Sequence, residues 1–319
     1  MKKVWAVLGV VGLSVTIAVG AAQAATFTAG DVFASVGSSQ VQQYSAAGVL
    51  KDTLTSGGGS FNTGSAFDTS GNMYVTNFDA NSVTKFAGPN DPHTSSSFGS
   101  GYSTPESIVF NSAGEVYIGG VGNGGIRHFD AAGNLLGSVI AGTRVDWMDL
   151  EADQTTMLYT QEGTSIKTVN VVTGVAGPDI ASGVVGNAFA LRILADGSIL
   201  VADEVNVKHL SATGTLIQTY NVAGEGTWFS LNLNNDGTSF WSGNFGSGKL
   251  YRFDIASGTL LQTLDTGVGG SRLYGVSVFG EVTAGCGSAC GGGTVPEPAS
   301  LILLGSGLAA LGLRQLRKA

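Results

Sequence analysis

A repeat of 40 to 43 residues constrains the fold of this chain more than any other feature. Each unit begins with a tight turn and an apolar strand, as in DTSGNMYVTN (68–77) and LADGSILVAD (194–203). Two apolar residues three positions apart follow, and then a second turn such as SATGTLIQT. The first members of these pairs are Val83, Ile126, Ile166, Val207 and Leu250, at spacings of 43, 40, 41 and 43 residues. A period of this length indicates one supersecondary unit that stacks on its neighbours.

The unit predicts strand, tight turn, strand, loop, strand, tight turn and strand, which is a four-stranded blade of a β-propeller. DVFASVGSSQVQQYSAAGVLKDTL (31–54) fits the last three strands of such a unit. LYGVSVFG (273–280) can supply the missing first strand from the other end of the chain. Closure of the ring in this way leaves no free sheet edge at the seam. We therefore predict an all-β, six-bladed propeller closed by N- and C-terminal strands.

The composition agrees with this fold and excludes some partners. Fifty glycines and few charges fit a β-protein with many tight turns. Residues 25–295 contain 10 basic and 22 acidic side chains, a net charge of −12. Binding to nucleic acid or to an anionic membrane surface needs clustered Lys and Arg. The charge therefore argues against both partners.

The C-terminal sequence VPEPASLILLGSGLAALGLRQLRKA (295–319) contains a short apolar span, Ala299 to Leu313. As a helix this span would be roughly 22 Å long, less than the roughly 30 Å of a bilayer core. Basic residues just beyond an apolar span favour a cytoplasmic tip. The basic residues here are Arg314, Arg317 and Lys318.

Pro-Glu-Pro, a Gly/Leu-rich span and an Arg-rich end, in this order, resemble the PEP-CTERM sorting signal of Gram-negative bacteria. The resemblance implies that Pro296, Glu297 and Pro298 are recognised by an exosortase, a membrane enzyme that processes such proteins. It also implies transient insertion of a short transmembrane helix in the inner membrane, followed by delivery to the cell surface or to an exopolysaccharide (biofilm) matrix. A permanent C-terminal anchor is the alternative.

The N-terminus has the pattern of a secretory signal helix. A Met-Lys-Lys start, an apolar run and the small residues Ala22 and Ala24 predict cleavage by signal peptidase between Ala24 and Ala25. The alternative is a retained N-terminal anchor. Export would place Cys286 and Cys290 in an oxidising compartment, where a local disulfide or an intermolecular link can form. The predicted segments are a signal peptide (1–24), the propeller (25–283), a Gly/Cys-rich linker (284–294) and the sorting signal (295–319).

The segment GNMYVTNFDANSVTKF (71–86) resembles the repeat units of NHL and gluconolactonase-like propellers. This resemblance implies the architecture more than the function, because propellers serve as hydrolases and as passive binding platforms.

Candidate ligand-binding residues fall in the loops between second and third strands and at the entrances to the blades, which share one rim of a propeller. The long stretch FAGPNDPHTSSSFGSGYSTPES (86–107) is expected on the same rim. Carboxylate and amide oxygens there could bind Ca²⁺ or another divalent cation, and tryptophans such as Trp147 could stack on sugar rings. Alternatively, such Asp and Asn side chains satisfy backbone donors, and the tryptophans belong to the core. The candidates are Glu106, Asn123, Asp146, Asp203, Trp228 and Asn244.

Two functions remain open from the sequence. The first, which we favour, is a non-catalytic binding module for an extracellular polymer such as exopolysaccharide, a small ligand or another surface protein. The second is a secreted metal-dependent, lactonase-like hydrolase, for which Glu106, Asn123 and Asp203 have suitable side chains. The sequence identifies no catalytic residue and no certain cofactor or metal site.

Overall fold

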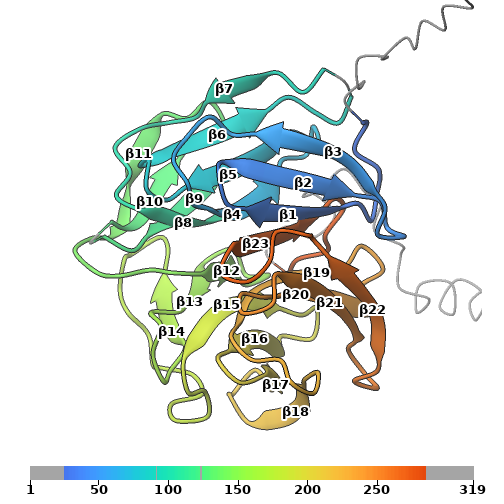
Figure 1. The fold of residues 1–319 in the computed structure, drawn as a ribbon. Coiled ribbons are helices and arrows are strands. Elements are labelled where there is room, and N and C mark those ends of the chain that lie inside the picture. Colours follow the sequence, from blue (N-terminus) through green and yellow to red (C-terminus); the bar gives the residue numbers. More distant parts are fainter. Residues whose placement is uncertain (1–24, 91, 123, 285–319) are drawn as a thin grey trace, which may run out of the picture.

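The chain is a six-bladed β-propeller, as predicted. The structure, a computed structural model, describes residues 25–90, 92–122 and 124–284, and within them 23 strands form six sheets around one axis (Figure 1). The first strand of each blade lies nearest the axis and contacts the first strands of both neighbouring blades. These six innermost strands therefore surround a central channel.

We number the blades in chain order and give the strands of each from the axis outwards. Blade 1 contains β23 (Leu273–Val278), β1 (Val32–Val36), β2 (Gln40–Tyr44) and β3 (Leu50–Thr55). Blade 2 contains β4 (Asn62–Phe67), β5 (Met73–Asn77), β6 (Ser82–Phe86) and β7 (Ser95–Ser97). Blade 3 contains β8 (Pro105–Phe110), β9 (Val116–Gly120), β10 (Gly125–Phe129) and β11 (Leu135–Ile140).

The second half of the ring has the same order. Blade 4 contains β12 (Met148–Leu150), β13 (Thr156–Tyr159) and β14 (Lys167–Asn170). Blade 5 contains β15 (Ala188–Ile193), β16 (Ile199–Asp203), β17 (Val207–Leu210) and β18 (Leu216–Tyr220). Blade 6 contains β19 (Trp228–Leu233), β20 (Ser239–Asn244), β21 (Lys249–Asp254) and β22 (Leu260–Asp265).

The ring is closed in blade 1, where the C-terminal strand β23 pairs with the N-terminal strand β1. The pairing is antiparallel and aligns Val278 with Val32 and Val276 with Ala34. This confirms the closure predicted from segments 31–54 and 273–280.

Blade 4 differs from the four-stranded pattern at its outer edge. Two isolated bridges, Ile166 to Ile180 and Val169 to Ala176, occupy the place of a regular fourth strand among the described residues. Pro178 lies between them and has no backbone N–H to donate to a ladder, which explains the interruption.

The stretch 86–107 was expected on one rim and is instead divided between the two ends of the propeller. Three serines, Ser95–Ser97, form the outer strand β7, so residues 87–94 turn at one end and residues 98–104 at the other. All three serines are exposed, and an edge strand of this kind needs no apolar residue. The prediction failed because β7 has no hydrophobic pattern.

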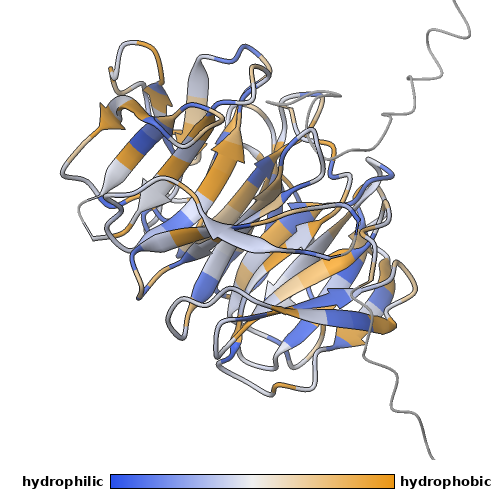
Figure 2. Cartoon of the chain, turned by 90° about the horizontal axis from the view of Figure 1, so that it is seen from above, coloured by the Kyte–Doolittle hydropathy of each residue, from blue (hydrophilic) through white to orange (hydrophobic). Residues whose placement is uncertain are grey.

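The core consists of apolar clusters between neighbouring blades, one at each of the six junctions that the described residues form. Both members of every repeated apolar pair are buried there, for example Val83 with Phe86 and Leu250 with Phe253. Figure 2 shows the hydrophobic stretches along the strands, inside the ring. The two members of a pair lie in the clusters on opposite sides of their blade, so the sequence period records the packing of third strands against both neighbouring blades.

The two ends of the propeller have different connections. We call the face with the second-to-third-strand turns and the inter-blade loops the upper face, and the opposite face the lower face. Each innermost strand runs from the upper face to the lower face, because the inter-blade loops lead into it.

Close approach of two blades at the seam requires a glycine at position 275. A Cβ atom there would overlap the backbone carbonyl oxygen of Thr63 in blade 2, which cannot move without shifting β4. We expect Gly275→Ala to lower the free energy of unfolding by about 1–3 kcal/mol, the usual cost of overpacking. Gly137→Ala is the matched control, because a Cβ on Gly137 in β11 meets no atom within 4 Å. Equal denaturation midpoints for the two variants would contradict this account.

Candidate functional site

A pocket of about 330 Å³ opens at the upper mouth of the channel. Residues from the first strands and adjoining loops of all six blades form it. Its lining consists of Phe61, Thr63, Phe78, Glu106, Arg144, Glu162, Phe189, Thr227, Phe229, Phe245 and Tyr274. The volume is at the lower end of the roughly 300–1,000 Å³ range of small-molecule sites.

Six aromatic rings form a continuous arc along one side of this pocket. From one end to the other they belong to Phe78, Phe61, Tyr274, Phe245, Phe229 and Phe189. The successive ring centroids lie 6.5, 4.7, 5.8, 5.9 and 5.1 Å apart. Aromatic pairs are favourable at such separations, so each ring supports its neighbours. The result is a wide apolar wall shared by blades 1, 2, 5 and 6.

Carboxyl groups and one guanidinium group, from blades 3 and 4, form the other side. Arg144 Nε donates to both oxygens of Asp146, at 2.7 and 2.9 Å, and its Nη2 lies 2.5 Å from Glu162 Oε2. Glu106, only 4% exposed, shares a hydrogen bond with Asp146. Arg144 therefore connects two carboxylates and covers a buried carboxyl pair.

Burial and the neighbouring charge of Asp146 raise the pKa of Glu106 well above its usual value. Burial also raises the pKa of Asp146, although the hydrogen bond and the positive charge of Arg144 oppose this rise. One proton shared by the pair removes the repulsion between two buried carboxylates. Burial therefore favours the neutral form of Glu106, whereas Arg144 favours the charged form of Asp146.

The structure brings together two of the six candidate residues, Glu106 and Asp146. Trp228 is fully buried in the core between blades 5 and 6, where its Nε1 donates to Asn221 Oδ1 at 3.2 Å. The next residue, Phe229, lines the pocket instead. Successive side chains of a strand point to opposite faces, which explains this difference between neighbours.

Asp203 and Asn244 hold loops in place at the upper face. Asp203 accepts hydrogen bonds from the backbone N–H groups of Gly186 and Asn187 and pairs with Lys208. Burial acts to raise its pKa, but these bonds dominate and lower it. Asn244 donates to the carbonyl oxygen of Gly226, and its Oδ1 accepts from the N–H of Ser247 at 2.9 Å.

Sequence reasoning missed the aromatic arc, although a signal for part of it exists. Asn77-Phe78 and Asn244-Phe245 follow the second strands of blades 2 and 6, and both phenylalanines line the pocket. A repeated Asn-Phe pair at equivalent positions would have indicated the wall. Phe61 and Thr227 lie in inter-blade loops and have no comparable pattern.

Several predicted residues lie outside the described residues. These are Asn123, the signal segment up to Ala24, both cysteines (Cys286, Cys290), the sorting motif (Pro296, Glu297, Pro298) and the basic tail (Arg314, Arg317, Lys318). In the described part of the chain, no helix is long and apolar enough to cross a bilayer. That part also contains no group of three or more His, Cys, Asp or Glu side chains placed to hold a metal ion.

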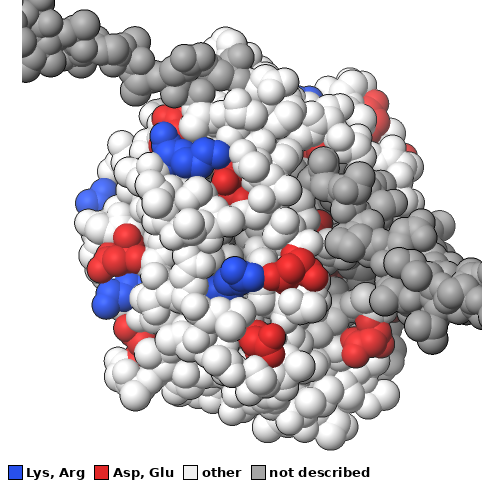
Figure 3. Space-filling model, turned by 90° about the vertical axis from the view of Figure 1, so that its right-hand side faces the viewer, with Lys and Arg blue, Asp and Glu red and all other residues white. Residues whose placement is uncertain are grey.

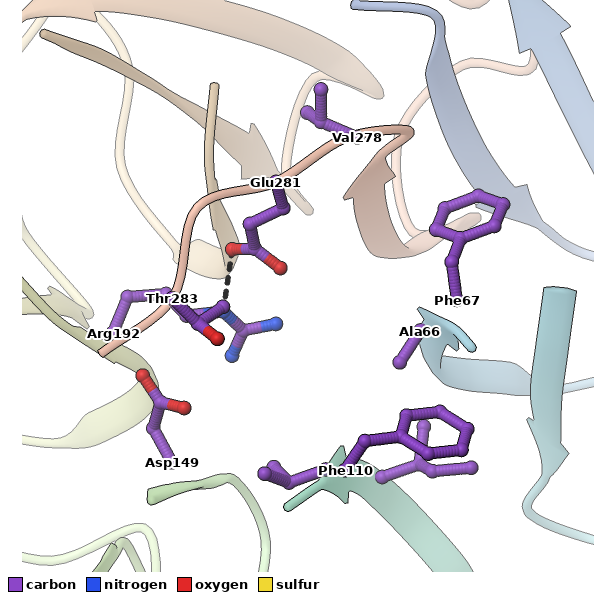
Figure 4. A pocket seen from close by; sticks show the side chains of 10 residues that line it. Ala66, Phe67, Phe110, Asp149, Arg192, Val278, Glu281 and Thr283 are labelled. Carbon is purple, nitrogen blue, oxygen red and sulfur yellow. Dashed lines mark hydrogen bonds and ion pairs between the residues drawn. The ribbon is translucent and has the colours of Figure 1, made fainter. Parts of the chain in front are cut away.

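The lower mouth of the channel is nearly closed. After β23, the chain crosses beneath the channel, and Glu281 Oε1 accepts hydrogen bonds at 2.8 Å from Arg192 Nε and from the N–H of Leu233 (Figure 4). Ala284 then packs against the core between blades 4 and 5. The remaining cavity is about 30 Å³, whereas one water molecule needs roughly 10–15 Å³. As the described residues form it, the lower mouth therefore has room for about two water molecules and for no sugar-sized ligand.

Asp149 completes this lower cluster. It is 2% exposed, and burial raises its pKa to about 6 although Arg192 and the N–H of Ile193 oppose the rise.

Comparisons with known proteins identify the fold of the body and the sorting motif near the C-terminus. A solved structure with a similar fold is a chain of the crystal structure of a nidogen/laminin complex, with a TM-score of 0.64 and 13% sequence identity. The match covers 78% of this chain and 97% of that chain. At this identity the likeness shows the propeller fold alone. A comparison with curated proteins finds no significant match.

The family model for the PEP-CTERM protein-sorting motif matches residues 294–318. The motif implies an exported protein that is anchored in the membrane and then processed by an exosortase-type enzyme. The chain thus combines a six-bladed propeller with a C-terminal sorting signal.

Proposed function

We propose that this protein is a non-catalytic binding module of the cell surface or the extracellular matrix, and that the pocket at the upper mouth is its binding site. The aromatic arc carries this proposal, because six neighbouring rings form an accessible apolar wall opposite polar groups. Phe61 is 41% exposed, so part of the wall meets solvent in the free protein. Apolar walls with few polar groups are typical of ligand sites.

The polar groups of the pocket support binding better than hydrolysis. Asp146 and Glu162 are held by Arg144, and Glu106 shares a hydrogen bond with Asp146. Asp203, one of the three residues considered for a lactonase-like metal site, is occupied by backbone N–H groups and Lys208. A metal-bound water would need carboxylate oxygens that are free to coordinate.

Removal of one ring tests the proposal. We expect Phe245→Ala to weaken the binding of the mature protein to extracellular polysaccharide from the producing cells about tenfold, because a lost aromatic contact costs roughly 1–2 kcal/mol. Leu261→Ala, at a 49% exposed position of the outer strand β22, is the control and should bind as the wild type does. The measurement is cosedimentation with the polysaccharide, with melting curves to confirm that both variants are folded. No binding by the wild type, or equal binding by Phe245→Ala, would refute the proposal.

A further inference from the structure

The charges in the pocket neutralise one another almost completely. Arg144 lies between Asp146 and Glu162, and burial favours the neutral form of Glu106, so little negative charge is left over. An anionic ligand would meet this charge and a protein body of net charge −12. A cationic ligand would find Asp146 paired on both oxygens and Glu162 with one free oxygen, and it would meet the positive charge of Arg144 beside them. The pocket therefore favours an uncharged ligand.

The two sides of the pocket require a ligand with two different sides. The arc offers aromatic carbon, whereas the opposite side offers hydrogen-bonding groups. Among the residues that the structure describes, Arg144 Nη1 has no hydrogen-bond partner, since Nε and Nη2 bind Asp146 and Glu162. Glu162 Oε1 has none either, and the Glu162 side chain is 33% exposed. A free donor beside a free acceptor matches two adjacent hydroxyl groups, each of which can donate and accept.

The closed lower mouth limits how a polymer can bind. The pocket lies at the upper mouth, and the cavity beside Arg192 and Glu281 at the lower mouth holds only about 30 Å³, too little for a polymer chain. A volume of about 330 Å³ accommodates a small ligand, not a long segment of polymer.

We infer that the pocket binds the uncharged terminal sugar ring of a polysaccharide, with the C–H face of the ring against Phe229, Phe245 and Tyr274 and two adjacent hydroxyls at Arg144 and Glu162. This inference rests on the proposed function and specifies its ligand. Few charges interrupt the surface in the view of Figure 3, where basic and acidic groups are scattered singly or in small groups. On this face the charged groups form no large patch that could attract an ionic ligand.

The test is isothermal titration calorimetry of the mature protein with three kinds of probe. These are methyl glycosides of neutral hexoses, methyl glycosides of the corresponding uronic acids (uronides), and choline. We expect a neutral glycoside to bind at least tenfold more tightly than its uronide and than choline. Arg144→Gln should weaken this binding at least tenfold. Arg252→Gln removes an ion pair of the same length, 2.5 Å to Asp236, far from the pocket, and should leave the affinity unchanged.

Two outcomes would overturn the inference in different ways. If polysaccharide binds in a Phe245-dependent manner but neutral glycosides do not compete, the binding function stands and the terminal neutral sugar is wrong. If a uronide or choline binds more tightly than the neutral glycoside, the inferred neutral sugar is likewise wrong and the binding function stands. If neither polysaccharide nor any glycoside binds, the proposed function itself fails.

Discussion

Trp228→Ala should destabilise the propeller by about 3–5 kcal/mol, the usual cost of removing a large aromatic side chain from a core. Trp228 has no exposed surface, and its ring centroid lies 5.3 Å from that of Tyr251 and 5.8 Å from that of Phe253. The substitution also removes one of the two donors to the side-chain oxygen of Asn221, which keeps the N–H of Val222. Urea denaturation of the mature protein measures the effect, provided that the transition is two-state.

Phe61→Ala is the control for Trp228→Ala, because it also removes an aromatic ring, but one that is 41% exposed in the pocket wall. We expect a loss of at most about 1 kcal/mol, mainly from the contacts of Phe61 with Phe78 and Tyr274. In ligand binding the expected order is reversed. Phe61→Ala should weaken binding, whereas the folded fraction of Trp228→Ala should bind as the wild type does. A small stability loss for Trp228→Ala would instead support the sequence-based hypothesis that Trp228 serves the ligand.

Arg192→Met should also cost about 3–5 kcal/mol at neutral pH, since removal of one partner leaves buried charge without compensation. The Arg192 side chain is 6% exposed. Its replacement leaves Glu281 and the nearby Asp149 at the lower mouth without a cationic neighbour. Lys167→Met is the control, because it breaks an exposed ion pair with Asp179. Exposed pairs contribute only about 0–1 kcal/mol.

The pH dependence distinguishes this charge effect from simple loss of packing. The pKa of Asp149 is about 6 in the folded protein, above its ordinary value of 3.8, so the folded state binds the proton more tightly than the unfolded state. This group therefore lowers stability as pH rises from about 4 to 6, with no further change above that range. Without Arg192 the pKa rises further, so the difference between variant and wild type should be small near pH 4.5 and largest near pH 8. A difference that is constant with pH would show that lost packing dominates.

The architecture was predictable because each blade repeats the same buried pair. Val83 packs against the next blade and Phe86 against the previous one, each at a fixed position of the third strand, so the spacing of such pairs counts blades. The outer strands carry less information, since they are exposed and need no apolar residue. The apolar pattern therefore could not predict the serine strand β7 or the bridged edge around Pro178.

The pocket was only partly predictable, because it is built by convergence of distant residues. Glu106 and Asp146 were recognised as polar residues at blade entrances, but their shared hydrogen bond depends on the neighbouring positions of β8 and β12. Phe229 was missed because its neighbour Trp228 is the more conspicuous residue. Which of two adjacent side chains faces the channel is set by the phase of the strand, and sequence alone leaves that phase open.

The position of Glu281 has a mechanical consequence for a tethered protein. The described chain ends at Ala284, after the lower face, so a pull applied there away from the upper face acts first on the contacts of Glu281 and Ala284. Beyond them it acts along β23, which runs in the same direction. The hydrogen bonds of β23 to β1 lie perpendicular to that pull, so they resist together instead of opening one after another. Such a pull therefore loads the seam that closes the ring in shear, and the pocket opens on the opposite face.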